Sequence, residues 1–242
     1  FFCPLKQNLI ALLSPIKMAT LSNTNDVFES MGIQMRDTIK TALRNPSLSV
    51  VYRALNSYVT LINEHDSFIL RAKFCSLISW SVPDKGAIKA IKDFVEDDRI
   101  LEVGAGNGLY SVLLNRSGAY CKPTDNYGTK YFVCDNNLTE IEKLDETQAI
   151  TKYGDYEVLM MIWPPPSDPM ACKALKAFKG NKVIYAGENE YGCTADYEFF
   201  QELDANWVAV NFYGNPQFNG FGDSFTFYRR RTEEDDEDSD SE

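Results

Sequence analysis

The stretch that decides the fold is RILEVGAGNGL, residues 99–109. Its first half, Arg99 to Val103, has the pattern of a short buried strand. Its second half is a loop with glycine at every second position, and a helical pattern follows from Leu109. Glycine lets the backbone approach another group closely, and a helix that begins directly afterwards presents unpaired N–H groups. The stretch therefore predicts a strand, a ligand-binding turn and a helix in immediate succession.

Strand and helix patterns continue to alternate after this stretch. Continuous apolar strands separated by helices indicate a parallel sheet covered on both faces, which is a doubly wound α/β fold. The segment Gly214–Gly222 is rich in Gly, Pro and Asn, contains no helical pattern, and predicts an antiparallel last strand. The expected strands are 120–123, a short piece at 138–144, 157–162, 182–186, 207–212 and 224–229, and the expected helices are 109–115, 147–152, 169–178 and 196–203.

Four segments follow from the patterns along the chain. Residues 1–24 form an arm, apolar over residues 1–17, that we expect to be disordered, a transit segment or foreign to the native protein. Residues 25–80 have helical spacing interrupted at Pro46, which predicts a helical extension of two or three helices. Residues 81–231 carry the alternating pattern, beginning with a helix after Asp84, and residues 232–242 are expected to be a disordered acidic tail. The apolar positions of the extension include Val51, Leu55, Tyr58, Val59 and Ile62.

The charge of the chain is concentrated at its end. The formal net charge is −11, but eight acidic residues lie between Glu233 and Glu242, and the remaining chain carries about −3. The body therefore neither requires nor excludes a nucleic-acid partner, and we expect the acidic tail to contact basic proteins.

Cysteine usage and hydropathy limit the kinds of site that the chain can hold. The 6 cysteines include no C-x-x-C pair, and His65 is the sole histidine, which disfavours a zinc site and a dense disulfide framework. Free thiols suit a reducing, intracellular compartment, so we expect a cytoplasmic protein with the nucleus as the alternative. No apolar run approaches the ~20 residues of a membrane-spanning helix, and we expect neither a membrane nor a metal partner.

The spacing of the glycine loop favours one class of ligand. A dinucleotide fingerprint reads G-x-G-x-x-G/A, whereas this loop reads G-x-G-x-G and continues with Leu109, which disfavours a nicotinamide cofactor. Glu102 at the end of the strand suits a cationic ligand such as the sulfonium of S-adenosylmethionine. Asp125 lies 17 residues after Gly108, where an acid that binds ribose hydroxyls is expected, with an exposed turn aspartate as the alternative. Asp145 is a candidate for the adenine edge or, equally, a helix N-cap.

These residues resemble those of a known family. The segment Leu101–Gly108 resembles motif I of class I S-adenosylmethionine-dependent methyltransferases, and the strand that ends at Trp163-Pro164-Pro165 is similar to their motif IV. Together with Val82-Pro83, Val183–Glu188 and Gly192-Cys193-Thr194, the chain looks like a poorly characterised methyltransferase-like group with a W-P-P signature. The resemblance implies a Rossmann-like, seven-stranded α/β sheet whose last strand is antiparallel. It also implies S-adenosylmethionine as the cofactor, bound by Glu102, Gly104, Ala105, Gly106, Asn107, Gly108, Asp125 and Asp145.

The Trp-Pro-Pro-Pro segment departs from the better-known pattern. Amino-methyltransferases that read N-P-P-Y or D-P-P-Y here hold the substrate amine with the first side chain and a proline carbonyl. An indole N–H can only donate, so Trp163 is expected to form a wall for a planar or cationic acceptor, or alternatively to be a core aromatic. Pro164 offers its carbonyl oxygen. Glu188 is the acid best placed to accept a proton, with a solvated loop glutamate as the alternative.

The sequence thus predicts methyl transfer to an unidentified acceptor, small molecule or nucleic acid, with N-methylation of a nucleobase or small molecule favoured. A catalytically silent binding or scaffold protein that kept the fold is the alternative. Tyr191 and Cys193 are reserve candidates, whereas His65 is expected on the surface. The helical extension is expected to pack on the sheet or over the cofactor and to supply part of the acceptor pocket.

Overall fold

A mixed sheet organises the computed structural model, which describes residues 24–128 and 137–235. Within these residues the sheet has seven strands in the order β3-β2-β1-β4-β5-β7-β6. The strands β1 to β5 run parallel, and β7 is antiparallel to both β5 and β6, as the helix-free connection before it predicts. The strands are β1 (Ile100–Val103), β2 (Cys121–Asp125), β3 (Glu142–Lys143), β4 (Val158–Ile162), β5 (Lys182–Gly187), β6 (Trp207–Gly214) and β7 (Ser224–Arg230).

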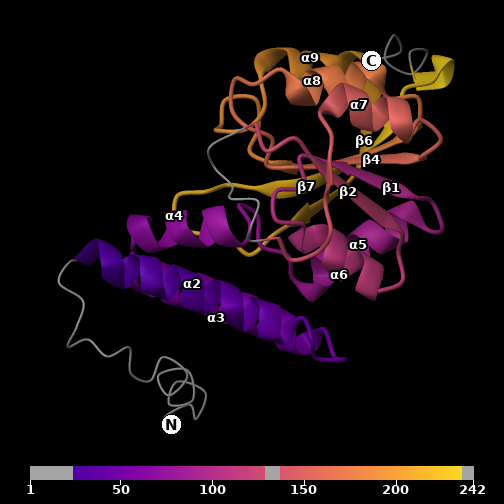
Figure 1. Cartoon of the computed structure of the whole chain (residues 1–242). Coiled ribbons are helices and arrows are strands. Elements are labelled where there is room, and N and C mark those ends of the chain that lie inside the picture. Colours follow the sequence, from indigo (N-terminus) through magenta and orange to yellow (C-terminus); the bar gives the residue numbers. More distant parts are fainter. Residues whose placement is uncertain (1–23, 129–136, 236–242) are drawn as a thin grey trace.

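Helices cover both faces of the sheet, which confirms the doubly wound arrangement (Figure 1). The helices α5 (Lys85–Val95) and α6 (Leu109–Arg116) lie on one face. The helices α7 (Glu146–Lys152), α8 (Met170–Ala177) and α9 (Tyr197–Asn206) lie on the other. Successive strand residues alternate between the two resulting cores: Ile100 belongs to the first core and Leu101 to the second. Parallel strands buried on both faces explain the continuous apolar runs in the sequence.

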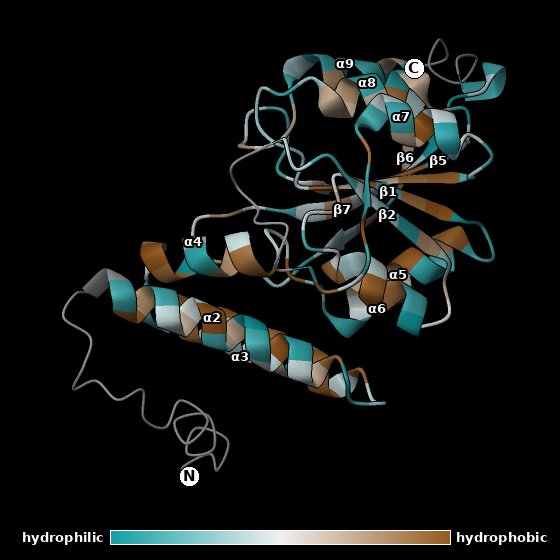
Figure 2. Cartoon of the chain, viewed as in Figure 1, coloured by the Kyte–Doolittle hydropathy of each residue, from teal (hydrophilic) through white to brown (hydrophobic). Residues whose placement is uncertain are grey.

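The helical extension consists of α2 (Thr24–Ala42), α3 (Ser49–His65) and α4 (Phe68–Leu77). The helices α2 and α3 run side by side, and α4 lies between this pair and the sheet (Figure 1). The expected apolar positions of α3 are all buried, in the same core as α5 and α6. Figure 2 shows brown, apolar residues on the strands and in patches along α3 and α4. The extension therefore packs on the α5–α6 side of the sheet, and the boundary that we place after Trp80 remains a prediction.

Most of the expected boundaries shift by a few residues, and two of the shifts concern the second strand and the tail. The strand expected at 120–123 runs from Cys121 to Asp125. Pro123 is tolerated inside it because β3 pairs only with Thr124 and Asp125, so no hydrogen bond to β3 requires an N–H at Pro123. The start of the acidic tail also has structure, because residues 233–235 form a helical turn and Arg229 donates to the carboxylate of Asp235. The rest of the expected tail and the arm before Thr24 lie outside the described residues.

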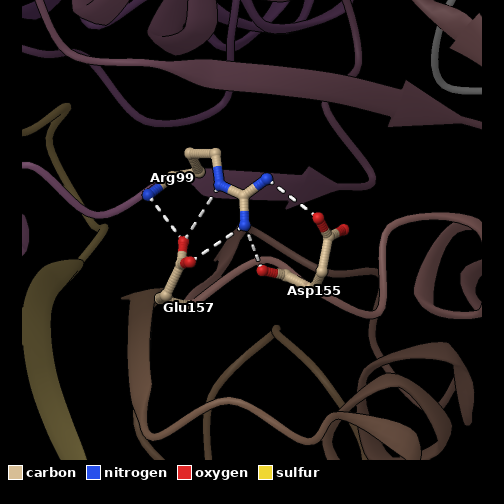
Figure 3. A network of polar contacts seen from close by, with 3 residues as sticks. All are labelled: Arg99, Asp155 and Glu157. Atoms are coloured by element: carbon tan, nitrogen blue, oxygen red, sulfur yellow. Dashed lines mark hydrogen bonds and ion pairs between the residues drawn. The ribbon is translucent and has the colours of Figure 1, made fainter.

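A polar cluster joins the amino ends of β1 and β4 (Figure 3). Arg99 donates through its backbone N–H, at 3.0 Å, and through its guanidinium to the Glu157 carboxylate. The guanidinium also donates to Asp155 and lies 4.8 Å above the ring of Tyr156. These contacts fix the register of β1 beside β4 at the edge of the sheet remote from the glycine loop.

Two features are absent from the described residues. No helix among them is long and apolar enough to cross a bilayer. They also include no cluster of three or more His, Cys, Asp and Glu side chains arranged to hold a metal ion.

Candidate active site

The glycine loop joins β1 to α6 and depends on glycine for its backbone shape. Gly104, Gly106 and Gly108 have φ angles of +74°, +56° and +76°, in the left-handed region that side chains disfavour. A Cβ atom on Gly108 would lie 2.7 Å from the Cγ2 atom of Thr139. Gly108 is therefore required by packing as well as by its φ angle, because residues 138–141 cross directly over it.

The carboxylate of Asp125 ties this loop to the end of β2. Its Oδ2 accepts a hydrogen bond of 2.8 Å from the N–H of Gly106, and its Oδ1 accepts one of 2.6 Å from the N–H of Tyr127. Burial raises the pKa of the Asp125 carboxyl above its ordinary value, and these two donors oppose the rise. Each carboxylate oxygen retains acceptor capacity for a ligand hydroxyl.

A pocket of about 580 Å³ opens at the carboxyl ends of β1, β2 and β4. Its lining brings together Gly104 after β1, Asp125 at the end of β2, Asp145 before α7, and Trp163 and Pro164 after β4. The carboxyl edge of a parallel sheet is where open α/β folds bind ligands, and the volume is typical of small-molecule sites. Residues that the sequence separates by up to 60 positions therefore share one cavity.

A small cavity of about 20 Å³ adjoins the pocket, since Trp80 and Gly104 line both. The sequence candidates Glu102, Ala105, Gly106 and Asn107 also line it. The Nδ2 atom of Asn107 donates to the carbonyl of Ser76 at 3.1 Å, whereas its buried Oδ1 atom has no hydrogen-bond partner among the described residues. An unpartnered buried acceptor carries an energetic cost that a ligand donor can relieve.

Glu102 is buried at the boundary between this cavity and α6. Its carboxylate accepts a hydrogen bond from the hydroxyl of Ser111 and lies 3.9 Å from the Sγ atom of Cys121. Burial raises the pKa of Glu102 to about 7, and the Ser111 hydrogen bond opposes this rise. Glu102 is thus a carboxyl whose ionisation a nearby cation would favour.

Asp145 is the N-cap of α7. Its Oδ1 accepts from the N–H of Gln148 at 2.7 Å, and the Gln148 side chain accepts in return from the Asp145 N–H at 3.1 Å. This reciprocal pair is a capping box, which the spacing D-x-x-Q allows. The N-cap interpretation is confirmed, and because Asp145 also lines the pocket, a contact with the adenine edge remains a prediction.

The Trp-Pro-Pro-Pro corner is held against the loop that follows β5. The backbone of Trp163 is left-handed, with φ +52°, and its N–H donates to the carbonyl of Ala186 at 2.7 Å. The carbonyl of Pro164 accepts from the N–H of Ala195 at 3.0 Å. The oxygen that the sequence offered to a substrate therefore already has one backbone donor, and one lone pair remains.

An aromatic wall forms at this corner from Trp80, Trp163 and Phe221. The rings of Trp80 and Trp163 stack with centroids 5.7 Å apart at an angle of 23°, and Phe221 lies 5.0 Å from Trp163. All three side chains line the pocket. Trp163 therefore packs against aromatic neighbours and also presents a surface to the cavity.

A buried carboxylate lies beside this wall. Burial raises the pKa of Asp223, and hydrogen bonds from Ser81 and Asn215, together with the indole N–H of Trp163, oppose the rise. The indole N–H itself is buried and has no partner of ordinary hydrogen-bond geometry in the described part of the chain. The indole is thus oriented by its packing against Trp80 and Phe221.

Glu188 does not line the pocket. Its Oε2 accepts from the N–H of Cys193 at 2.7 Å, and its Oε1 accepts from the N–H of Gly222 at 3.2 Å. The carboxylate thereby joins the loop after β5 to the loop before β7.

Of the reserve candidates, Cys193 lines the pocket, whereas Tyr191 is 90% exposed. His65 is exposed at the end of α3, as expected.

Several lining residues were missing from the sequence candidates. One face of α4 contributes Phe68, Arg71, Ala72 and Cys75, whose spacing of i, i+3, i+4 and i+7 identifies a helix face but not what it faces. Phe221 comes from the Gly/Pro/Asn-rich connection, where no local pattern predicts burial. The extension therefore supplies part of the pocket, as expected.

Comparison with known proteins gives structural likeness at very low sequence identity. No protein-family model and no curated protein sequence matches the chain. The fold is similar to that of magnesium protoporphyrin IX methyltransferase from Synechocystis PCC 6803 with bound S-adenosylmethionine, with a TM-score of 0.44, 10% identity, and coverage of 72% of this chain and 97% of that chain. For 1,6-didemethyltoxoflavin-N1-methyltransferase from Burkholderia thailandensis the TM-score is 0.47, the identity 9%, and the coverage 75% and 89%. For a mutant of MtNAS in complex with S-adenosylmethionine the corresponding values are 0.45, 10%, 94% and 96%.

Proposed function

We propose that this chain is a class I S-adenosylmethionine-dependent methyltransferase and that its W-P-P corner stands in the place of motif IV. The observation that carries the proposal is the shared pocket, in which the glycine loop, the Asp125 carboxylate and the Trp163-Pro164 corner meet at the carboxyl edge of β1, β2 and β4. Motifs I and IV are expected at this edge, where a cofactor and an acceptor can lie side by side.

The residues present fit the cofactor. Asp125 has acceptor capacity for ribose hydroxyls, and Asp145, which lines the same pocket, is our candidate for the adenine edge. The unpartnered Oδ1 of Asn107 suits the ammonium group, and the Glu102 carboxyl suits the positive charge of the ligand. Gly104 keeps the backbone open to the pocket, because a Cβ atom there would approach Met170 to 3.1 Å.

Methyl transfer requires the protein mainly to align the two reactants. When bound, the cofactor would supply an electrophilic methyl group: the electron pair of its carbon–sulfur bond would stay on sulfur, the acceptor lone pair would bond to carbon, and an N–H acceptor would release its proton to solvent. Much of the barrier reduction in such a displacement comes from holding the reactants in line in a dry site. Trp163 and Trp80 supply a water-excluding wall for the acceptor, and the remaining lone pair of the Pro164 carbonyl suits an N–H donor. A nitrogen of a nucleobase or small molecule is therefore the favoured acceptor.

One observation favours a second candidate, a catalytically silent binding protein. Both oxygens of Glu188 and the Pro164 carbonyl already accept backbone hydrogen bonds, so these two sequence candidates for catalysis serve the structure. Such a protein would bind the cofactor or its demethylated product without transferring a methyl group.

Isothermal titration of the full chain with S-adenosylmethionine and S-adenosylhomocysteine tests the cofactor, and Gly106→Arg serves as the variant that blocks the loop. Binding by the native chain, lost in Gly106→Arg, supports the proposal, whereas no heat with either compound contradicts it. Transfer of a tritiated methyl group to fractionated cellular pools then separates an enzyme from a silent protein.

The free thiols of Cys75, Cys121, Cys172 and Cys193 suit assay in a reducing buffer and an intracellular, cytoplasmic location.

A further inference from the structure

The pocket contains a cation without a carboxylate partner. Arg71 lies on the face of α4 that lines the pocket, and its Nη1 donates to the carbonyl of Asn219 at 2.7 Å. No ion pair involves Arg71 among the described residues. The other cation of the lining, Lys173, faces Glu146 at 3.7 Å. A guanidinium has five N–H donors, so Arg71 retains most of them for a ligand.

Aromatic rings hold this guanidinium in place. Its central carbon lies 4.4 Å from the ring centroid of Phe221 and 5.1 Å from that of Phe68. Phe221 also packs against Trp163 of the aromatic wall, at 5.0 Å. The charge is therefore preorganised at the border of the wall, and its orientation costs little entropy when an anion binds.

The same arrangement argues against a cationic acceptor. Aromatic walls bind ammonium groups through the negative faces of their rings. Here Arg71 already occupies the face of Phe221, so this face is closed to a second cation. A flat apolar ring with an anionic group at its edge satisfies both the wall and the guanidinium.

The lining also favours a small molecule over a nucleic acid. The carboxylates of Asp125, Asp145, Glu146 and Asp168 line the pocket against two cations. A polyanionic chain needs several phosphate contacts to cationic groups, and among the described residues this lining offers one cation outside an ion pair. Phe68 is 70% exposed while it lines the pocket, which suits the entry of an apolar ring from solvent.

We propose that the methyl acceptor is a small planar aromatic molecule that carries a carboxylate or phosphate group, with its ring against Trp80 and Trp163 and its anion paired with Arg71. This inference rests on the proposed function in one respect, namely that the bound molecule accepts a methyl group. The anion site itself is a property of Arg71 and the aromatic wall, and it can be tested without methyl transfer.

The test measures binding of three matched probes to the full chain: 2-naphthoate, its neutral amide 2-naphthamide, and the cation 2-naphthylmethylammonium. Titrations are run with and without saturating S-adenosylhomocysteine. The native chain is expected to bind 2-naphthoate about tenfold more tightly than 2-naphthamide, which is about 1.4 kcal/mol, and to bind the cation most weakly. Equal affinities, preference for the cation, or no binding of 2-naphthoate up to its solubility limit would overturn the proposal.

Variants then assign the preference to one residue. Arg71→Gln is expected to abolish the preference for 2-naphthoate over 2-naphthamide while leaving 2-naphthamide binding unchanged, and Arg71→Lys is expected to retain part of it. The matched control is Arg53→Gln, which removes an exposed charge from α3 and should change neither affinity. An unchanged preference in Arg71→Gln contradicts the proposal even if that variant folds normally.

Two further measurements identify the kind of anion that binds and test the anion site separately from the proposed function. 2-Naphthyl phosphate compares phosphate with carboxylate, and displacement of 2-naphthoate by decauridylate more effectively than by uridine 5′-monophosphate would overturn the assignment to a small molecule. The S-adenosylhomocysteine titration reports on the proposed function alone. A chain that binds no cofactor but binds 2-naphthoate through Arg71 therefore rejects the methyltransferase and retains the anion site.

Discussion

The carboxylate of Asp125 accepts a 2.8 Å hydrogen bond from the N–H of Gly106, so the end of β2 holds the middle of the glycine loop. The contact joins residues 19 positions apart at the point where two parallel strands end. A carboxylate with two backbone donors shapes the loop before any ligand arrives, and its remaining lone pairs still face the pocket.

Asp125→Ala is expected to weaken binding of S-adenosylhomocysteine at least tenfold and to lower thermal stability. The substitution removes two charge-assisted hydrogen bonds, each worth about 1.5–3 kcal/mol, and frees the loop to move. Titration calorimetry and thermal unfolding measure the two effects. Asp93→Ala, at an exposed carboxylate of α5, is the control, and equal affinities of the two variants would contradict the role of Asp125.

Glu102 should make the stability of the chain depend on pH. Its pKa is about 7 in the folded protein against an ordinary 4.5, so between these values the folded state keeps a proton that the unfolded state has lost. The free energy of unfolding should therefore fall as pH rises through this window, by up to about 3 kcal/mol from this group.

Urea unfolding across the window checks this expectation in the native chain and in Glu102→Gln. The amide cannot ionise, so the variant should gain stability relative to the native chain as the pH rises. Parallel stability curves for the two proteins would show that Glu102 ionises as easily in the folded state as in the unfolded state.

Local patterns were sufficient to predict much of this structure. The glycine loop, the buried strands and the helix after Asp84 each follow from a few neighbouring residues, because strand period, glycine φ angles and caps are local properties. Asp145 shows the same, since the spacing D-x-x-Q contains the whole capping box. The number of strands came from the resemblance to a family, whereas the antiparallel last strand followed from the helix-free connection before it, and the sheet has both features.

Contacts between distant segments could not be predicted in this way. Phe221 reaches Trp163 and Arg71 from a connection without periodicity, and Glu188 finds donors in two loops 29 residues apart. The sequence identified Glu188 as an acid after a strand, but whether its oxygens are free depends on where Gly222 lies. The aromatic wall and the position of Arg71 depend on the same long-range placement.

Arg99 provides a stability test that should leave the pocket untouched. Its guanidinium bonds Glu157 and Asp155 at the amino ends of β1 and β4, the opposite edge from Gly104 (Figure 3). Arg99→Ala is expected to lower the melting temperature by about 2–4 °C, because the exposed network makes a modest contribution. Affinity for S-adenosylhomocysteine should stay within twofold, as judged by titration. A large loss of affinity would show that the two edges of the sheet are coupled.

Variants of Glu188 show whether this residue accepts a proton or positions the two loops. If its role is to join the loops at Cys193 and Gly222, Glu188→Ala should lose about 1.5–3 kcal/mol of unfolding free energy and raise KM for the acceptor more than it lowers kcat. Glu188→Gln keeps one acceptor oxygen and should retain most of the turnover with an unchanged pH profile. Glu190→Gln, in the same loop, controls for the loss of charge. If Glu188→Gln instead abolishes turnover at unchanged KM and removes a limb of the pH profile, the carboxylate takes the proton, and its hydrogen bonds to the two loops must open during the reaction.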